Sequence, residues 1–215
     1  MGICFSDFSI VYQKRNEKIR KSETVGFFKL EQAKHRNEDL FIFDPKVFFK
    51  FLLQGMLLFP SSTVVRRSIY EKSGGYTKNF ERQISCDWDY ALRISREAPT
   101  AYLKKVLMTK IFYENNVSID GIKTALSDIV VLNNLLAAGI LSEQERRIAK
   151  KRLAGRMYNV GYGFLETDNY IEARKWIRKS FYEKPMMNNF KYLILTSMHT
   201  RLFAYFRQLK RSMAL

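Results

Sequence analysis

The sequence has few of the residues that form disulfides and metal sites. Only two of its 215 residues are cysteines and only two are histidines. Cys4 and Cys86 form no Cys-x-x-Cys pair, and neither stands at a metal-ligand spacing from His35 or His199. This scarcity argues against a zinc site and a disulfide scaffold, and it fits a protein of the reducing cytoplasm.

Long apolar segments are also missing. The most apolar one, residues 47 to 59, contains Lys50, Gln54 and Gly55 and is stopped by Pro60, so it falls short of the roughly 20 residues that span a bilayer. The opening "MGICFSDFSIVY" has no basic stretch ahead of an apolar one, so it does not read as a signal peptide. We therefore expect a globular, cytoplasmic protein.

Acidic side chains are scarce relative to basic ones. Lys and Arg total 37 against 21 Asp and Glu, which gives a formal net charge of +16, and the basic residues run from Lys14 to Arg211. A surface of this charge attracts nucleic acid, anionic lipid headgroups or phosphate-bearing substrates. A solvated basic surface without a specific partner explains the charge equally well.

The first half of the chain mixes strand and helix patterns, which indicates an α/β domain. Residues 3 to 12 have strand composition, and because nothing precedes them their neighbours in the sheet are expected to be missing in part. A polar loop or edge hairpin follows, with a short strand at residues 25 to 30. Asp44 and Pro45 start a helix that runs to about residue 56.

Further along, residues 63 to 66 read as a short strand and Ser68 with Glu71 as the capping box of a brief helix. Gly74 and Gly75 end that helix in a left-handed cap. A helix from about residue 86 to 98 and one or two more strands complete this part.

Beyond residue 116 the pattern is helical throughout, with helices expected at residues 119 to 138, 142 to 166 and 169 to 183 and onward. A window of about 34 residues resembles a tetratricopeptide helix pair. The residues that carry this resemblance are Val160, Gly161, Phe164, Ala173, Ile177 and Pro185. We place the domain boundary between residues 118 and 119, with an all-α extension over residues 119 to 215.

Residues 200 to 215 form a basic amphipathic pattern, with Leu202, Phe206, Leu209 and Met213 on one stripe. Such a helix can lie on an anionic membrane surface, which would make the protein peripheral at the inner face of the membrane. The same stripe can equally complete the helical extension.

Two carboxylates, Asp87 and Asp89, flank Trp88 where a helix begins. They suit the positive end of that helix, and Asp89 with Arg93 has the spacing of an ordinary ion pair. Asp-Trp-Asp is literally an Asp-x-Asp, but residues i and i+2 of a helix point to different sides, so the pair is a poor metal chelate. Trp88 lies on the stripe expected to face the core.

A resemblance gives Asp87 a second interpretation. The segments "GMLLFPSSTVVRRSIYEKSGGY", "SCDWDYALRISREAPTAYLKKVLMTKIFY" and "NNVS" look like the C-terminal half of a family 2 glycosyltransferase catalytic domain of the GT-A fold, a nucleotide-sugar-binding mixed sheet with flanking helices. The likeness covers roughly residues 1 to 118, in the family's order. Cys86 stands where the family has Glu or Gln, and the family's His before the N-x-S segment is absent.

The resemblance implies an inverting transfer of a sugar from a nucleotide sugar to a saccharide or lipid-linked acceptor. Asp87 takes the position of the catalytic base, and Trp88 and Asp89 shape the acceptor pocket. Arg66 and Arg67 are candidates for anion contacts or for structural salt bridges.

The nucleotide-binding half of that family, with its metal-binding Asp-x-Asp, has no counterpart in these residues. We therefore expect a divalent Mn or Mg ion only in a completed enzyme, and none bound by this chain. We also expect a truncated product or a separately encoded N-terminal half, and a chain that is inactive alone. The alternatives are a basic nucleic-acid-binding module, for which no recognition motif is present, and a non-catalytic helical scaffold.

Overall fold

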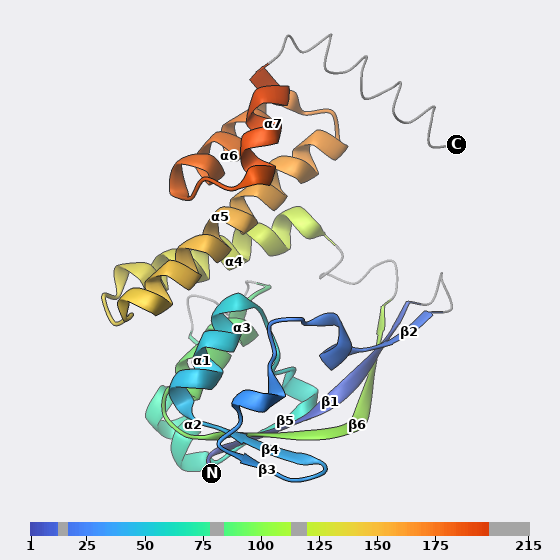
Figure 1. Cartoon of the computed structure of the whole chain (residues 1–215), viewed down its shortest axis with the longest axis vertical. Coiled ribbons are helices and arrows are strands. Elements are labelled where there is room, and N and C mark those ends of the chain that lie inside the picture. Colours follow the sequence, from blue (N-terminus) through green and yellow to red (C-terminus); the bar gives the residue numbers. More distant parts are fainter. Residues whose placement is uncertain (13–16, 78–83, 113–119, 198–215) are drawn as a thin grey trace. The chain divides into compact units, whose positions relative to one another are not determined.

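The computed structural model describes residues 1–12, 17–77, 84–112 and 120–197. The chain divides into two compact units, Met1–Ile119 and Asp120–Leu215, shown in Figure 1 and taken separately below. The boundary expected at residue 118, the N-x-S segment and the basic amphipathic segment at residues 200 to 215 lie outside the described residues.

The first unit contains a mixed sheet with the strand order β2-β1-β6-β4-β3, and β5 pairs with β1 in addition. β1 runs parallel to β6 and antiparallel to β2 and β5, so neighbours from this chain lie at both of its edges. The expected strand at residues 3 to 12 is thus confirmed, but the expectation that its neighbours are missing in part is wrong. Strands of this chain pair with residues 3 to 12 along one edge and with residues 3 to 5 and 9 to 12 along the other. The strands are β1 Ile3–Tyr12, β2 Glu17–Arg20, β3 His35–Arg36, β4 Leu40–Phe43, β5 Thr63–Val65 and β6 Thr100–Phe112.

Among the described residues of the first unit, three helices accompany the sheet: α1 Pro45–Gln54, α2 Arg67–Ser73 and α3 Cys86–Ser95. Asp44 caps α1 by accepting a hydrogen bond from the N–H of Lys46, and Pro45 occupies the first helical position, as expected. α1 and α3 pack against each other (Figure 1). Short 3-10 turns lie at Lys21–Thr24, Leu30–Gln32 and Pro60–Ser62.

Aromatic side chains fill the space between α1 and the sheet. The ring of Phe48 lies 5.5 Å from that of Phe5 on β1 and 5.9 Å from that of Phe43 on β4. Residues 25 to 30 do not form the expected strand: Phe28 follows a turn, and its ring packs 5.1 Å from that of Tyr102. Tertiary burial of one aromatic ring thus outweighs the local strand propensity.

The capping box expected at Ser68 is wrong. α2 begins at Arg67, so Ser68 lies inside it, and Arg66 in the capping position makes no side-chain cap. Glu71 instead pairs with Arg67, its Oε1 lying 2.8 Å from Nε. The left-handed end is confirmed, because Gly74 and Gly75 have φ values of 77° and 64°.

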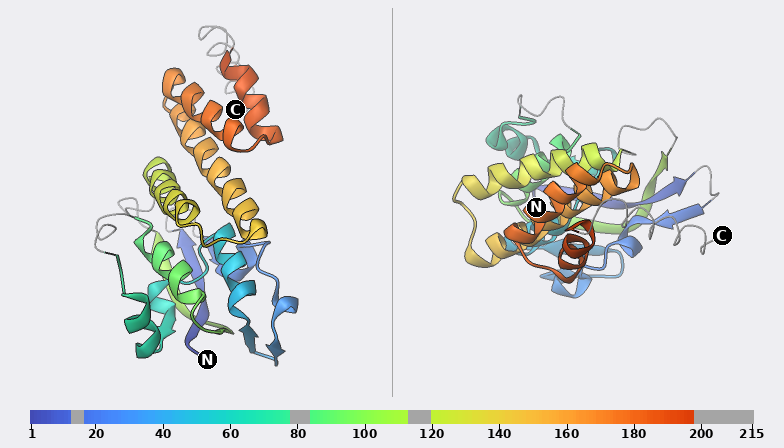
Figure 2. Two further views of the ribbon diagram at one scale, coloured as in Figure 1. Left: turned by 90° about the vertical axis from the view of Figure 1, so that its left-hand side faces the viewer. Right: turned by 90° about the horizontal axis from the view of Figure 1, so that it is seen from above.

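The second unit contains helices only among its described residues: α4 Gly121–Ala137, α5 Glu143–Glu166, α6 Tyr170–Glu183 and α7 Met187–Ser197. α5 is the long helix of this unit and packs against both α4 and α6 (Figure 2). Ser142 and Glu145 form a complete capping box at its start. None of the described helices combines the length and the apolar character needed to cross a bilayer.

α5 packs closely on α6 at residues that were named from the sequence. Gly161 is buried, and a Cβ atom there would lie 2.7 Å from Cγ1 of Ile177 and 3.0 Å from the carbonyl oxygen of Ala173. Val160, Ala173 and Ile177 have no exposed surface. Gly161, Ala173 and Ile177 therefore meet at one helix-helix contact, and Phe164 packs against the same cluster. Pro185 is exposed and lies beyond the end of α6.

Candidate functional site

Asp87 lies in the first turn of α3. Its Oδ1 accepts a hydrogen bond of 2.8 Å from the N–H of Trp88, the next residue. Ser85 holds the capping position but makes no side-chain cap. A negatively charged side chain in the first turn interacts favourably with the positive end of the helix.

Asp87 lines a small pocket between α3 and the segment that joins α1 to β5. The pocket volume is about 90 Å³, which is room for about three water molecules. Asp87 is the one carboxylate among the described residues that line it. The others are Met56, Leu58, Pro60, Thr63, Val65, Tyr76, Tyr90, Ala91 and Ile94. This lining, mostly apolar with one charged group, is typical of binding sites, although the volume admits only part of a sugar ring.

The charge of Asp87 acts on three neighbouring groups. Burial, reinforced by that charge, raises the pKa of the Tyr76 hydroxyl and of the Cys86 thiol. Burial lowers the pKa of Lys110, and the carboxylate of Asp87 partly opposes this. Sequence reasoning missed Lys110, whose Nζ lies 4.4 Å from the centre of the Phe59 ring.

Trp88 belongs to the core rather than to the lining of the pocket. Its side chain is 3% exposed, and its indole N–H donates a hydrogen bond of 2.8 Å to the carbonyl of Leu52 at the end of α1. Ala91, Leu92 and Ser95 are buried on the same stripe of α3, as the sequence predicts. The substrate contact that the resemblance implies for Trp88 has no exposed ring face to support it.

Asp89 faces a different side of α3 from Asp87. Its Oδ2 lies 3.0 Å from Nε of Arg93 and accepts a hydrogen bond of 3.2 Å from the hydroxyl of Thr77. Arg93 in turn donates to the carbonyls of Ser73 and Gly75, at 2.5 and 2.7 Å. Asp89 and Arg93 thus attach the end of α2 to α3, and Asp89 does not line the pocket.

This arrangement does not fit a metal ion. Oδ2 of Asp89 is already engaged by Arg93 and Thr77, and Asp87 points elsewhere. No group of three or more His, Cys, Asp and Glu side chains gathers anywhere in the described parts of the chain. The two carboxylates of Asp-Trp-Asp therefore face different partners in this fold.

The two arginines at the start of α2 differ. Arg67 pairs with Glu71, and both side chains are exposed, so this ion pair adds little stability. Arg66 is exposed and directly follows Val65, a residue of the pocket lining, while its backbone N–H donates to the carbonyl of Gly2 at 2.8 Å. Arg66 remains the candidate of the two for an anion contact.

Asp7 is a second buried carboxylate that sequence reasoning did not single out. It is 3% exposed on β1, and its oxygens accept hydrogen bonds from Arg20, Ser22, Tyr102 and the N–H of Phe8. Burial alone would raise the pKa of Asp7, but these donors outweigh burial and lower the pKa below its ordinary value. A charged residue within an apolar strand was the signal available in the sequence.

With this geometry established, comparison with protein-family models, with curated proteins and with solved structures finds no match to the chain.

Proposed function

We propose that the first unit is the acceptor side of an inverting glycosyltransferase of family 2, in a partial GT-A fold, with Asp87 as the base. One observation carries this proposal. Asp87 is the single carboxylate among the described residues around a largely apolar pocket, where the resemblance expects the base. A mixed sheet flanked by helices is consistent with that resemblance.

The chemistry explains the need for a carboxylate at this point. An acceptor hydroxyl is a weak nucleophile, and Asp87 would accept its proton as the oxygen attacks the anomeric carbon of the donor sugar. The C–O bond to the nucleotide diphosphate breaks on the opposite side, so the configuration at the anomeric carbon inverts. The pocket volume fits a hydroxyl-bearing part of a saccharide or lipid-linked acceptor.

Asp89 and Trp88 would position Asp87 and would not contact the substrate. Trp88 anchors the first turn of α3 to α1, and Asp89 attaches α3 to the turn after α2. Both interactions hold Asp87 at the pocket. Arg66 is the residue in this unit that we assign to an anion contact with the substrate.

Departure of the diphosphate requires positive charge that the described residues do not arrange. The nucleotide-binding strands and the divalent Mg or Mn site of the family would have to come from residues outside these 215, either another chain or a longer one. The 215 residues alone are expected to turn over no nucleotide sugar.

The proposal is tested by completing the enzyme. The chain is joined to, or expressed with, the nucleotide-binding half of a family 2 glycosyltransferase, and release of nucleoside diphosphate is measured over a panel of nucleotide sugars and acceptors. Turnover is expected, and Asp87→Asn is expected to lower it by about 10²- to 10⁴-fold, the range of general-base catalysis.

Asp39→Asn is the matched control, because Asp39 is an exposed carboxylate of the same unit that pairs with Lys105. It should leave turnover unchanged. Binding of a nucleotide sugar with full turnover in Asp87→Asn would remove Asp87 from the role of base. Absence of turnover with every donor, in an assembly that binds nucleotide sugar, would contradict the proposed function itself.

A further inference from the structure

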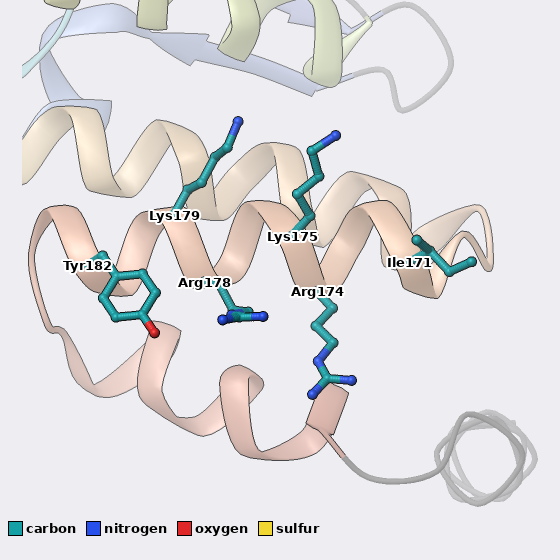
Figure 3. A pocket seen from close by; sticks show the side chains of 6 residues that line it. All are labelled: Ile171, Arg174, Lys175, Arg178, Lys179 and Tyr182. Carbon is teal, nitrogen blue, oxygen red and sulfur yellow. The ribbon is translucent and has the colours of Figure 1, made fainter.

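One face of α6 carries four cations that the proposed glycosyl transfer does not use. Side chains of this helix alone enclose a shallow surface hollow of about 480 Å³ (Figure 3). We call this surface the α6 basic face. Its residues are Ile171, Arg174, Lys175, Arg178, Lys179 and Tyr182.

The α6 basic face has an apolar midline with cations on both flanks. At about 100° per residue these side chains span an arc of roughly 140°, with Ile171 and Tyr182 near its middle. The two lysines point to one side of the helix axis and the two arginines to the other (Figure 3). Ile171 and Tyr182 are 80% and 74% exposed and lie about 16 Å apart along the helix.

Most of this positive charge is not neutralised within the described residues. Lys175 pairs with Glu172 at 3.0 Å. Among the described residues no carboxylate lies within ion-pair distance of Arg174, Arg178 or Lys179, and Nζ of Lys179 lies 4.4 Å from the Trp176 ring centre. The nearby Glu183 is directed to Lys150 at 3.9 Å.

The opposite face of α6 holds the helix in place. Ala173, Ile177 and Ser180 have no exposed surface, and the hydroxyl of Ser180 donates a hydrogen bond of 2.7 Å to the carbonyl of Ala154 on α5. The α6 basic face is therefore presented by a helix that is already folded and packed. Changes to its exposed side chains are expected to leave that packing intact.

We infer that the α6 basic face docks on an anionic membrane surface. Lys and Arg side chains at the flanks reach lipid phosphates, while a midline of Ile171 and Tyr182 enters the boundary between headgroups and acyl chains. Each basic residue near such a surface adds to the electrostatic attraction. Nucleic acid would use the same cations, but it offers no apolar layer that favours an exposed isoleucine on the midline between them.

The test is sedimentation of the whole chain with vesicles of phosphatidylcholine, with or without about one third phosphatidylserine. In the α6 variant Arg174→Gln, Lys175→Gln, Arg178→Gln and Lys179→Gln are combined. The matched control combines Lys29→Gln, Lys34→Gln, Arg36→Gln and Lys46→Gln, four exposed cations of the first unit. Circular dichroism melts check that both variants fold.

The chain and the control are expected to bind the anionic vesicles only, and the α6 variant to bind them at least about tenfold more weakly. A second variant, Ile171→Ser with Tyr182→Ser, should weaken vesicle binding while leaving binding to a single-stranded RNA unchanged. Equal vesicle binding by the α6 variant and the control would overturn the inference. So would a failure of the unsubstituted chain to bind anionic vesicles, whether or not it binds RNA. None of these outcomes bears on Asp87.

Discussion

The indole N–H of Trp88 donates a hydrogen bond of 2.8 Å to the carbonyl oxygen of Leu52, which joins the first turn of α3 to the last turn of α1. That carbonyl also accepts the N–H of Gly55 at 3.1 Å. Because Trp88 is fixed in this way, Asp87 and Asp89 on either side of it are held in different directions. The position of the candidate base therefore depends on a core contact between two helices.

Trp88→Phe tests this contact. The substitution removes the indole donor and part of the buried ring, and we expect it to lower the free energy of unfolding by about 1 to 3 kcal/mol. Urea denaturation followed by circular dichroism measures the change. Trp176→Phe is the control, because Trp176 is partly exposed on α6; equal losses in the two variants would count against a specific role for the bond to Leu52.

Asp87→Asn and Asp89→Asn should separate catalysis from stability. Asp89 supports Arg93, which in turn holds two carbonyls of the turn after α2, so Asp89→Asn should lower the free energy of unfolding by about 1 to 3 kcal/mol. Asp87 lines the pocket, and its substitution should change stability by less than about 1 kcal/mol. Denaturant midpoints of both variants decide the matter, and a larger loss for Asp87→Asn would mark Asp87 as structural.

Local patterns in the sequence predicted most of the elements correctly. Asp44 followed by Pro45 fixes the start of α1, and Gly74 with Gly75 ends α2, because each depends on the conformations that one or two residues favour. The helices of the second unit follow from apolar periodicity. Such signals lie within a few residues of the structure they determine.

The sequence predictions failed where contacts between residues far apart in the sequence determine the structure. The N–H of Arg66 pairs with the carbonyl of Gly2, and with this pairing α2 starts at Arg67 rather than after Ser68. The partners of Asp7 come from β2, the turn after it and β6, far apart in the sequence. Nothing in the sequence indicated that Lys110 lies near Asp87. A strand pattern predicts β6, but it does not predict that a side chain of β6 lies near the first turn of α3.

Asp7 should make the first unit sensitive to acid. Its folded-state pKa lies below the ordinary value of 3.8, so the unfolded chain takes up this proton first as the pH falls. The stabilisation is complete above the ordinary pKa and is lost as the pH falls through the lower folded-state pKa. Asp7→Asn lacks the charge, so its free energy of unfolding at neutral pH should be lower by roughly 3 kcal/mol. It should also lose less stability than the unsubstituted protein as the pH falls below about 4.

Urea midpoints at several pH values between neutral and strongly acid measure this difference. Asp39→Asn is again the control, because its exposed pair with Lys105 should contribute little stability. An unchanged acid dependence in Asp7→Asn would show that the buried network around Asp7 does not control the acid stability of the unit.

Two glycines of α5 offer an internally matched test of the α5–α6 contact. An added Cβ at Gly161 would lie 2.7 Å from Cγ1 of Ile177 and 3.0 Å from the carbonyl of Ala173, whereas one at Gly155 meets no atom within 4 Å. In an open helix interior, Gly→Ala stabilises by up to about 1 kcal/mol. At Gly161 the overlap should outweigh this and destabilise by about 1 to 3 kcal/mol, because one neighbour is backbone.

Gly155→Ala should therefore raise the thermal midpoint of the protein while Gly161→Ala lowers it, although both changes add the same methyl group to the same helix. Combining Gly161→Ala with Ile177→Ala removes the Cγ1 atom at the overlap, so the double variant should lose less stability than the two single losses add up to. If both glycine-to-alanine variants were stabilised, α5 and α6 would have to lie further apart than the 2.7 Å contact requires, and the tetratricopeptide-like packing of this helix pair would be refuted.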